Sequence, residues 1–233
     1  DHMQVVILAG GLGTRLWPMT KTVPKPMVPV GGEPYLAHQL RFLQGQGYTD
    51  VLILTGYLGE QIEDYFGDGS AIGLHIGYSR EPGPLGTGGA LRHASSLLEE
   101  VFLLIYGDSF LPIEYGLLER RLMETGATAV VALFEDRDGE TGVVANVDID
   151  RDGFVTRYQK NSPDSGLRFI DAGVLAMRAE AIQLIPAGEK SSLEELIFPQ
   201  LIERHALAAV TTGQRFYDIG TPDRLRVIEA FLA

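Results

Sequence analysis

The 233-residue chain contains no cysteine and a single tryptophan. The absence of cysteine excludes a disulfide scaffold, a thiolate nucleophile and any zinc or iron–sulfur site built on thiolates. Long apolar runs are also absent: the stretch over residues 5–9 is far shorter than the roughly 20 residues that span a bilayer, and no basic leader precedes it. The sequence therefore predicts a cytoplasmic protein with no membrane segment. Asp1 and His2 precede Met3 and are interpreted as the remnant of an expression tag.

Positive charge is scarce as well. The chain has 19 Lys and Arg residues against 31 Asp and Glu residues, which gives a formal net charge of −12. Nucleic acid is not an expected partner, because binding its phosphates requires a basic footprint. With 45% hydrophobic and 21% charged residues, the composition is that of an ordinary soluble globular protein. The oligomeric state stays open, a homo-oligomer included.

The few cations are not spread evenly. Residues 3–32 contain Arg15, Lys21 and Lys25 but no acid. An even distribution of the acids would place about four of them in this window. An acid-free, cationic segment in an acidic protein indicates an anion-binding site, although a short basic surface loop would show the same pattern.

Strand-like and helix-like segments alternate over the first 140 residues. Apolar runs typical of buried strands cover residues 4–9, 51–55, 101–106 and 128–134, and residues 74–78 are also strand-like. Apolar residues at helical spacing predict helices over residues 34–47, 59–66, 90–98 and 117–123. This alternation predicts an α/β fold with a Rossmann-like, mostly parallel central sheet flanked by helices.

The pattern changes near residue 140. Segments 143–149, 154–158 and 169–177 follow one another closely, and we expect them to form an antiparallel or mixed sheet beside the first. Farther along, Ser192 and Glu195 have the spacing of a capping box, and Thr221-Pro222-Asp223 has the residue types that open a helix. The sequence therefore predicts one domain over residues 3–233, made of two lobes that meet near residue 140.

Three glycines follow the first predicted strand directly, in the sequence Leu8-Ala9-Gly10-Gly11-Leu12-Gly13-Thr14-Arg15. Glycine accepts positive φ and lets backbone N–H groups converge on an anion. The loop matches neither the dinucleotide-binding pattern nor the P-loop, and prolines at positions 18, 24, 26 and 29 disfavour a following helix. With Arg15 adjacent and Lys25 nearby, the loop predicts a polyphosphate site and argues against a Rossmann-type oxidoreductase.

Several separated motifs, in order, resemble the signature of the sugar-1-phosphate nucleotidyltransferases (NDP-sugar pyrophosphorylases). They are LAGGLGTRL over residues 8–16, PKPMVPVGGEPYL over 24–36, LGTGGA over 85–90, YGD over 106–108 and FYDIGTP over 216–222. The resemblance extends over nearly the whole of residues 3–233. Within the family, LGTGGA together with YGDS is most similar to heptose-1-phosphate guanylyltransferases and related small bacterial enzymes.

The resemblance implies the nucleotide-diphospho-sugar transferase (GT-A-like) fold, with a nucleotide-binding lobe over residues 3–140 and a smaller mixed-β, sugar-phosphate-binding lobe over residues 141–233. It also implies a reaction in which a nucleoside triphosphate and a sugar 1-phosphate give an NDP-sugar and pyrophosphate, as in cell-surface polysaccharide biosynthesis. GTP with a heptose or mannose-like 1-phosphate is the first expectation. The alternative is thymidylyl, uridylyl or cytidylyl transfer to a hexose 1-phosphate. A non-catalytic nucleotide-sugar sensor is an alternative of another class, although such relatives usually lose motif residues that this chain retains.

In this reaction the sugar phosphate itself supplies the nucleophile, so the protein must hold two anions in line and stabilise the leaving pyrophosphate. The resemblance implies that Arg15 neutralises the pyrophosphate and that Lys25 reaches the α-phosphate, with Asp108 as the third catalytic residue. The residues implied to bind the nucleotide are Leu8, Ala9, Gly10, Gly11, Gly13, Thr14, Glu81, Gly86, Gly88 and Gly89.

Two aspartates are candidates for a metal site. Asp108 follows the apolar strand 101–106 and so lies at a carboxyl end, where ligands gather in open α/β sheets. Asp218 ends a short predicted strand over 215–217. Two carboxylates plus substrate phosphates suit Mg²⁺, so the sequence predicts a magnesium site at Asp108 and Asp218, although either residue alone could be a turn or cap residue.

Glu81 is expected at the nucleobase, because a carboxylate can accept hydrogen bonds from guanine N1 and N2 while the nearby glycines let a flat base lie against the backbone. An exposed loop acid is the alternative interpretation. On the sugar side, the resemblance places Lys160 at the sugar phosphate, where many family members have Glu-Lys and this chain has Gln159-Lys160. It places three further residues at the sugar: Gly142, Asp171 and Gly173.

Overall fold

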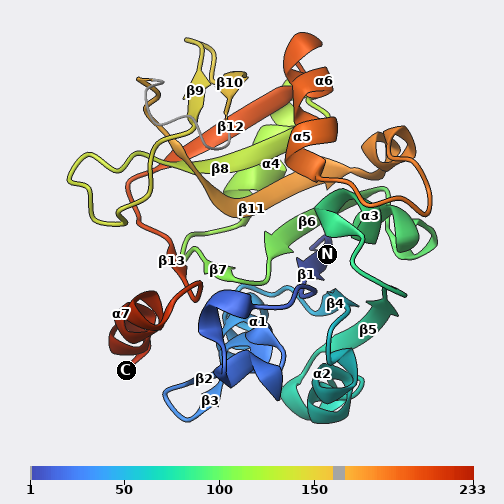
Figure 1. Cartoon of the computed structure of the whole chain (residues 1–233). Helices are drawn as coiled ribbons and strands as arrows, with labels where there is room; N and C mark the ends of the chain where they lie inside the picture. The colour runs from blue at the N-terminus through green and yellow to red at the C-terminus, as the bar shows by residue number, and fades with distance from the viewer. Residues whose placement is uncertain (1, 160–165) are drawn as a thin grey trace.

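The computed structural model describes residues 2–159 and 166–233. Seven strands form its central sheet: β1 (Gln4–Leu8), β4 (Asp50–Thr55), β5 (His75–Arg80), β6 (Val101–Tyr106), β8 (Ala129–Phe134), β11 (Ile170–Arg178) and β12 (Leu207–Thr212). Their order across the sheet is β12-β8-β11-β6-β1-β4-β5 (Figure 1). All neighbouring pairs are parallel except those of β11, which runs antiparallel to β6 and to β8. The prediction of a mostly parallel central sheet is confirmed.

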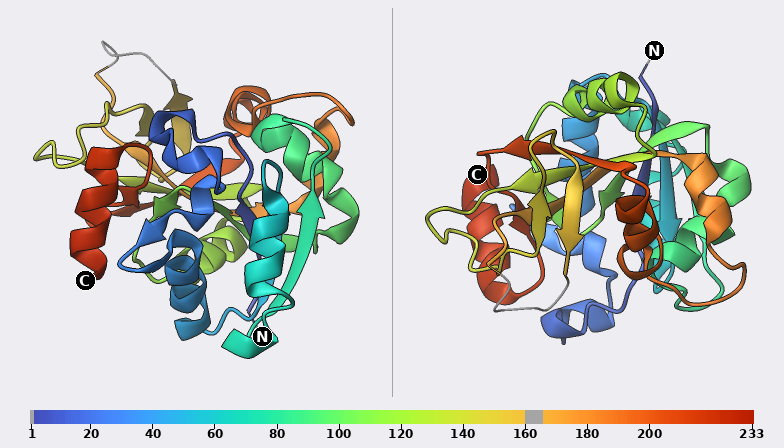
Figure 2. Two further views of the ribbon diagram at one scale, coloured as in Figure 1. Left: turned by 60° about the horizontal axis from the view of Figure 1, so that its bottom comes forward. Right: turned by 90° about the horizontal axis from the view of Figure 1, so that it is seen from above.

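Helices cover both faces of this sheet (Figures 1 and 2). In β1, Val5 and Ile7 belong to one apolar core and Val6 to the other, because successive side chains of a strand point to opposite faces. Three helices contribute to the first core: α1 (Tyr35–Gly45), α2 (Gly59–Phe66) and α4 (Gly116–Thr125). Three contribute to the second: α3 (Gly86–His93), α5 (Leu193–Leu196) and α6 (Phe198–Glu203). Burial on both faces explains why the central strands are apolar throughout.

The strands after residue 140 differ from the expectation. β9 (Val147–Ile149) and β10 (Val155–Tyr158) form a separate two-stranded antiparallel ribbon. β11 does not join them in a second sheet; it lies inside the main sheet between β6 and β8. Its residues 172–177 are all buried. The apolar run indicates this burial, but the direction of the strand and its neighbours are set by tertiary packing.

The loop after β1 opens no α-helix, as predicted. It forms three short 3-10 turns: η1 (Thr14–Leu16), η2 (Met19–Lys21) and η3 (Lys25–Met27). The hairpin of β2 (Pro29–Val30) and β3 (Glu33–Pro34) then leads into α1. The remaining 3-10 turns are η4 (Ser70–Ile72), η5 (Ser95–Leu97) and η6 (Ala179–Leu184).

The C-terminal segment packs against the N-terminal loop. The last helix, α7 (Pro222–Leu232), begins where predicted, and the Thr221 side chain caps it by accepting from the Arg224 N–H at 3.3 Å. Leu225 and Ile228 of α7 share a third apolar cluster with Leu16 and Val28. Just before α7, β13 (Tyr217–Asp218) pairs with β7 (Ser109–Phe110). Among the described helices, none has both the length and the apolar character that crossing a bilayer requires.

Candidate active site

A cavity of about 770 Å³ opens at the carboxyl ends of β1, β4 and β5, within the size range of ligand pockets. Much of its wall consists of residues predicted to bind the nucleotide: Leu8, Gly10, Gly11, Gly13, Thr14, Glu81 and Gly86. The rest of its lining includes Leu54, Tyr57, Thr87 and Lys190. Parallel strands deliver their following loops to one edge of the sheet, which is why segments distant in sequence meet here.

The glycine loop folds back onto Lys25. Gly13 has φ +61°, a left-handed conformation that glycine adopts without strain. The buried Thr20 donates its hydroxyl proton to the Gly13 carbonyl at 2.6 Å. A Cβ at Gly13 would lie 3.0 Å from Thr20 Cγ2 and 3.3 Å from Lys25 Cβ. The glycine loop and the Lys25 side chain are therefore packed closely against each other.

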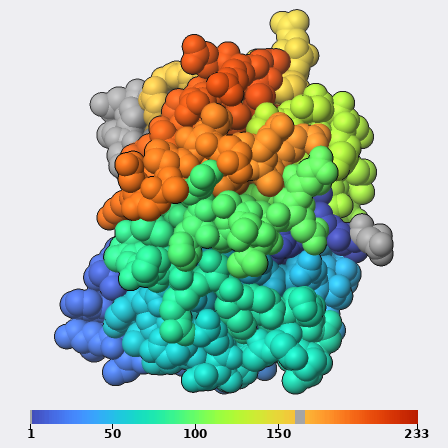
Figure 3. Space-filling model, turned by 90° about the vertical axis from the view of Figure 1, so that its right-hand side faces the viewer, coloured from blue at the N-terminus to red at the C-terminus, as the bar shows by residue number. Residues whose placement is uncertain are grey.

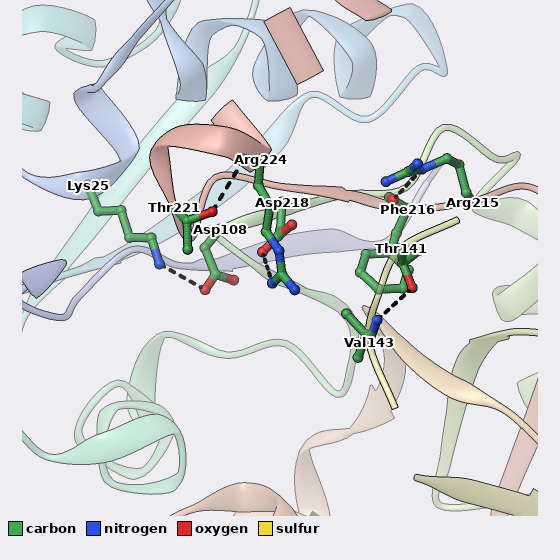
Figure 4. A network of polar contacts seen from close by, with 9 residues as sticks. All are labelled: Lys25, Asp108, Thr141, Val143, Arg215, Phe216, Asp218, Thr221 and Arg224. Atoms are coloured by element: carbon green, nitrogen blue, oxygen red, sulfur yellow. Dashed lines mark hydrogen bonds and ion pairs between the residues drawn. The ribbon is translucent and has the colours of Figure 1, made fainter. Parts of the chain in front are cut away.

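Asp108 lies next to this loop because β6 and β1 end in close contact. The Gly107 N–H donates to the Leu8 carbonyl at 2.8 Å, and a Cβ at Gly107 would lie only 2.3 Å from the same oxygen. Lys25 Nζ lies 3.3 Å from Asp108 Oδ2 and donates a hydrogen bond to it (Figure 4). The structure thus brings together Lys25 and Asp108, two of the three residues predicted to be catalytic.

Asp218 is brought to the same place by β13. It stands opposite Ser109 in the β13–β7 ladder, and the next N–H, that of Ile219, donates to the Asp108 carbonyl at 3.1 Å. Asp218 Oδ2 accepts a hydrogen bond from Arg224 Nη1 at 3.0 Å, so each of the two aspartates has a cationic partner (Figure 4).

The oxygen donors of this pair are those that Mg²⁺ prefers. The described residues include no group of three or more His, Cys, Asp or Glu that could hold a metal. The Asp108 side chain is 47% exposed, so solvent and phosphate oxygens can reach it. The two carboxylates fit a magnesium ion that takes its remaining ligands from phosphates and water.

Glu81 occupies the space that two glycines leave open. Its Oε1 lies 3.1 Å from the position of a Cβ at Gly10 and 2.8 Å from that at Gly56. Its Oε2 accepts a hydrogen bond from the Leu85 N–H at 3.2 Å. Burial raises the pKa of the Glu81 carboxyl above its ordinary value, and the Leu85 hydrogen bond opposes that rise only in part. The Glu81 carboxyl group lines the cavity and carries hydrogen-bond acceptor oxygens.

Lys25 and Asp108 are not among the residues that line this cavity, and neither are four other residues predicted to bind the nucleotide or to be catalytic. Gly88 and Gly89 are buried within α3, where a Cβ would lie 2.7 Å from Ser191 Oγ and 2.6 Å from the Glu189 carbonyl respectively, so these glycines allow close packing. Ala9 is buried behind the loop, where its N–H donates to the Leu54 carbonyl at 2.8 Å. Arg15 lies exposed on η1, and across residues 2–159 and 166–233 its side chain has no hydrogen bond or ion pair.

The predicted sugar-side residues lie on two segments. Asp171 is in β11, where its carboxylate accepts from the Tyr158 hydroxyl at 2.8 Å and from the Gly173 N–H at 2.9 Å. Gly173 has φ +83°, and a Cβ there would lie 2.9 Å from Ser109 Cβ, so this irregular part of β11 approaches the Asp108 segment. Gly142 is exposed in the loop after β8, with φ +67°. Lys160 lies outside the described residues.

Thr87 and Lys190 are among the residues of the cavity wall that sequence reasoning missed. Thr87 lies inside the LGTGGA segment, and that motif could have indicated it. Lys190 reaches the cavity from the segment before α5, and it is the only Lys or Arg among the described lining residues. Nothing in its local sequence distinguishes it from any surface lysine.

Comparison with known proteins yields a family and several relatives. A family model described as nucleotidyl transferase matches residues 4–233. The D-glycero-alpha-D-manno-heptose 1-phosphate guanylyltransferase of Campylobacter jejuni subsp. jejuni is 33% identical over 221 residues, which cover 95% of this chain and 96% of the relative. The mannose-1-phosphate guanylyltransferase of Mycobacterium tuberculosis is 32% identical over 225 residues, 95% of this chain but only 62% of that relative. The N-acetylmuramate alpha-1-phosphate uridylyltransferase of Neisseria meningitidis is 33% identical, and the match covers 98% of this chain and 97% of the relative.

Solved structures agree with the fold. HddC from Yersinia pseudotuberculosis matches with a TM-score of 0.85 at 27% identity over 100% of both chains, and its complex with GMP-PN matches with a TM-score of 0.83. A putative glucose-1-phosphate thymidylyltransferase from Bacillus anthracis has a TM-score of 0.87 at 22% identity, covering 99% of this chain and 95% of that one, and supports the fold alone. The predicted nucleotide-diphospho-sugar transferase fold is confirmed.

Proposed function

The chain belongs to the nucleotidyl transferase family, and we propose that it joins a nucleoside triphosphate to a sugar 1-phosphate, with release of pyrophosphate. One observation carries this proposal: the glycine loop, Lys25 and Asp108 meet at the carboxyl ends of β1 and β6. This is the arrangement that phosphoryl chemistry requires, with backbone donors, a cation and a carboxylate at one point.

In the proposed reaction, an oxygen of the sugar phosphate attacks the α-phosphorus of the triphosphate. The bond from that phosphorus to the bridging oxygen breaks, and pyrophosphate leaves with the electron pair. The protein contributes alignment and charge rather than a nucleophile. Backbone N–H groups of residues 10–14 bind the triphosphate, Lys25 contacts the α-phosphate, and the exposed Arg15 neutralises the pyrophosphate. Lys160 is proposed to bind the phosphate of the sugar.

We assign the metal site to Asp108 and Asp218. A magnesium ion bound there supplies positive charge to the phosphate oxygens. The Arg224 guanidinium holds the Asp218 carboxylate at the start of α7, and the Lys25 ammonium holds that of Asp108 beside the glycine loop. Both carboxylates therefore have a fixed direction before substrate arrives.

Guanine is the proposed base and a heptose or mannose-like sugar the proposed acceptor. The Glu81 carboxylate in the cavity wall supports guanine, because guanine offers N1–H and N2–H donors to it. The guanylyltransferases among the relatives named above support the same choice. Asp171 is proposed to accept hydrogen bonds from sugar hydroxyls. We propose that the reaction takes place in the cytoplasm, where nucleoside triphosphates are available, and that it serves NDP-sugar biosynthesis for cell-surface polysaccharides.

The test is a matrix of ATP, GTP, CTP, UTP and dTTP against a panel of sugar 1-phosphates, read by pyrophosphate release. We expect the largest signal for GTP with a heptose or mannose 1-phosphate. Lys25→Ala and Asp108→Ala are expected to abolish the signal in every combination. Triphosphate binding without pyrophosphate release anywhere in the matrix would contradict the proposal and favour a nucleotide-sugar sensor.

Asp218 and Asp223 provide a matched pair of variants. Each carboxylate pairs with an arginine of α7, Asp218 with Arg224 and Asp223 with Arg226, but the Asp223 side chain is 87% exposed and that of Asp218 is 21% exposed. Asp218→Asn is expected to lower turnover by about 100-fold or more, as loss of a charge-stabilising group does. Asp223→Asn should leave turnover unchanged. Equal effects of the two substitutions would contradict the metal assignment.

A further inference from the structure

Glu194 is a buried acid that the reaction described above does not use. It is 7% exposed, and it is the only Asp, Glu, Lys or Arg in the described part of the chain that is buried. A carboxylate removed from water is costly unless hydrogen-bond donors surround it. The positions of those donors therefore show which segments of the chain Glu194 connects.

Within the described residues, three hydroxyl groups from different segments donate to Glu194. Its Oε1 accepts from the Tyr106 hydroxyl, and its Oε2 accepts from Ser192 Oγ at 2.6 Å and from Thr87 Oγ1 at 3.2 Å. Thr87 lines the nucleotide cavity, while Tyr106 is the last residue of β6, two positions before Asp108. One carboxylate thus connects the nucleotide cavity to the segment that carries Asp108.

The backbone around Glu194 is pressed against the same cavity wall. The Ser191 N–H donates to the Leu85 carbonyl at 2.9 Å, and the Gly88 N–H donates to the Ser191 carbonyl at 3.0 Å. A Cβ at Gly86 would lie 2.3 Å from that Ser191 oxygen, so glycine is required for this approach. Figure 3 shows the orange segment that includes α5 directly against the green segment that includes α3. The wall over residues 85–90 is therefore supported by the segment around Glu194.

Tyr106 also connects Glu194 to the residues proposed to bind the sugar. The Tyr106 hydroxyl donates to Glu194, and the negative charges of both Glu194 and Asp171 act on the buried Tyr106 ring. Asp171 in turn accepts from Tyr158, whose phenol pKa is raised by burial and by the Asp171 charge. Glu194 therefore lies between the cavity for the nucleotide and the residues proposed for the sugar.

We propose that Glu194 is a positioning residue for nucleotidyl transfer: by accepting hydrogen bonds from Thr87 and Tyr106 together, it fixes the nucleotide cavity relative to Asp108. This inference rests on the proposed function. It predicts a particular kinetic signature, because each substrate still has its own binding groups when Glu194 is altered. Misplacement of reacting groups by about 1 Å can lower a rate about 100-fold, so kcat should fall while triphosphate affinity changes little.

The first test compares Glu194→Gln with Glu195→Gln, a substitution of its exposed neighbour. For Glu194→Gln we expect kcat for pyrophosphate release to fall at least about 30-fold, while the calorimetric Kd for the triphosphate stays within about threefold of wild type. Glu195→Gln should match wild type in both. The inference is overturned if kcat of Glu194→Gln stays within threefold, or if its Kd rises as much as its kcat falls. A wild-type chain that releases no pyrophosphate would instead overturn the proposed function and, with it, this inference.

A double-mutant cycle separates positioning from a general loss of packing. Thr87→Val and Tyr106→Phe each remove one donor to Glu194 while keeping the shape of the side chain. If the described contacts couple Thr87 to Tyr106 through Glu194, the double variant should lose no more than about threefold in kcat beyond the worse single variant. Losses that multiply would overturn the inference. This cycle keeps Glu194 itself and decides the question even if Glu194→Gln fails to fold.

Discussion

Gly107→Ala tests whether the contact between the ends of β1 and β6 positions Asp108. A Cβ at Gly107 would lie 2.3 Å from the Leu8 carbonyl oxygen, 3.1 Å from the Leu8 carbonyl carbon and 3.3 Å from Ala9 Cα. All three are backbone atoms, which cannot swing aside as a side chain can. The substitution must therefore separate the two strand ends.

The size of the effect follows from these distances. A carbon–oxygen contact needs more than 3 Å, so the strand ends must move apart by about 1 Å, and the Gly107–Leu8 hydrogen bond is weakened. Overpacking costs about 1–3 kcal/mol and a lost hydrogen bond about 1 kcal/mol more. A loss of about 3 kcal/mol corresponds to a melting temperature lower by about 6–12 °C in a domain of this size. Displacing Asp108 by about 1 Å should lower kcat about 100-fold.

The assay is pyrophosphate release at 25 °C, where the variant is expected to remain folded, with circular dichroism melts to confirm this. Gly45→Ala in α1 is the control, because a Cβ there has no atom within 4 Å and alanine favours a helix. It should keep wild-type turnover and stability or gain slightly. A folded Gly107→Ala protein whose kcat stays within threefold of wild type would refute the argument that this contact positions Asp108.

Two further predictions concern Glu81 and the metal. Burial raises the pKa of the Glu81 carboxyl above 4.5, so its ionisation destabilises the fold; this penalty is absent while the group is protonated and grows as pH rises from about 4.5. Glu81→Gln should therefore become more stable relative to wild type from pH 4 to pH 7, and melting-temperature differences that stay constant over this range would contradict the assignment. Excess chelator should abolish pyrophosphate release yet shift the melting temperature by less than about 2 °C, since Lys25 and Arg224 already pair with the two aspartates. Undiminished turnover in chelator would count against the metal site.

Some elements were predictable because local sequence determines them. β6 and α2 have the predicted bounds, residues 101–106 and 59–66, since each has a strong apolar pattern and clear ends. α3 begins at Gly86 rather than at Ala90, because the glycines of its first turn have low helix propensity and their helical state depends on packing against residues 189–193. The position of β11 inside the main sheet is likewise a tertiary effect.

In the candidate site, too, some residues could be placed from the sequence and others are brought together only by the fold. The glycine loop and Asp108 could be placed together because both follow strands of a parallel sheet, and one topological rule then brings them to one edge. Glu194 could not. The Ser192–Glu195 cap is confirmed, with the Glu195 N–H donating to Ser192 Oγ at 3.3 Å, but the acid between them resembles any first-turn glutamate. Its partner Thr87 is 107 positions away in the sequence, so only the fold brings them into contact.

The charge distribution explains how an acidic protein can bind two anionic substrates. Exposed charges act over only about 8 Å at physiological ionic strength, so the net charge of −12 matters less than the groups within the site. The Lys25 side chain is only 18% exposed and is directed by Asp108 toward the edge of the glycine loop. In the proposed function, an incoming phosphate would therefore meet an ammonium group that is already oriented, and little conformational entropy would be lost on contact with Lys25. The acid that lowers the net charge of the site thus also orients the cation proposed to bind the substrate.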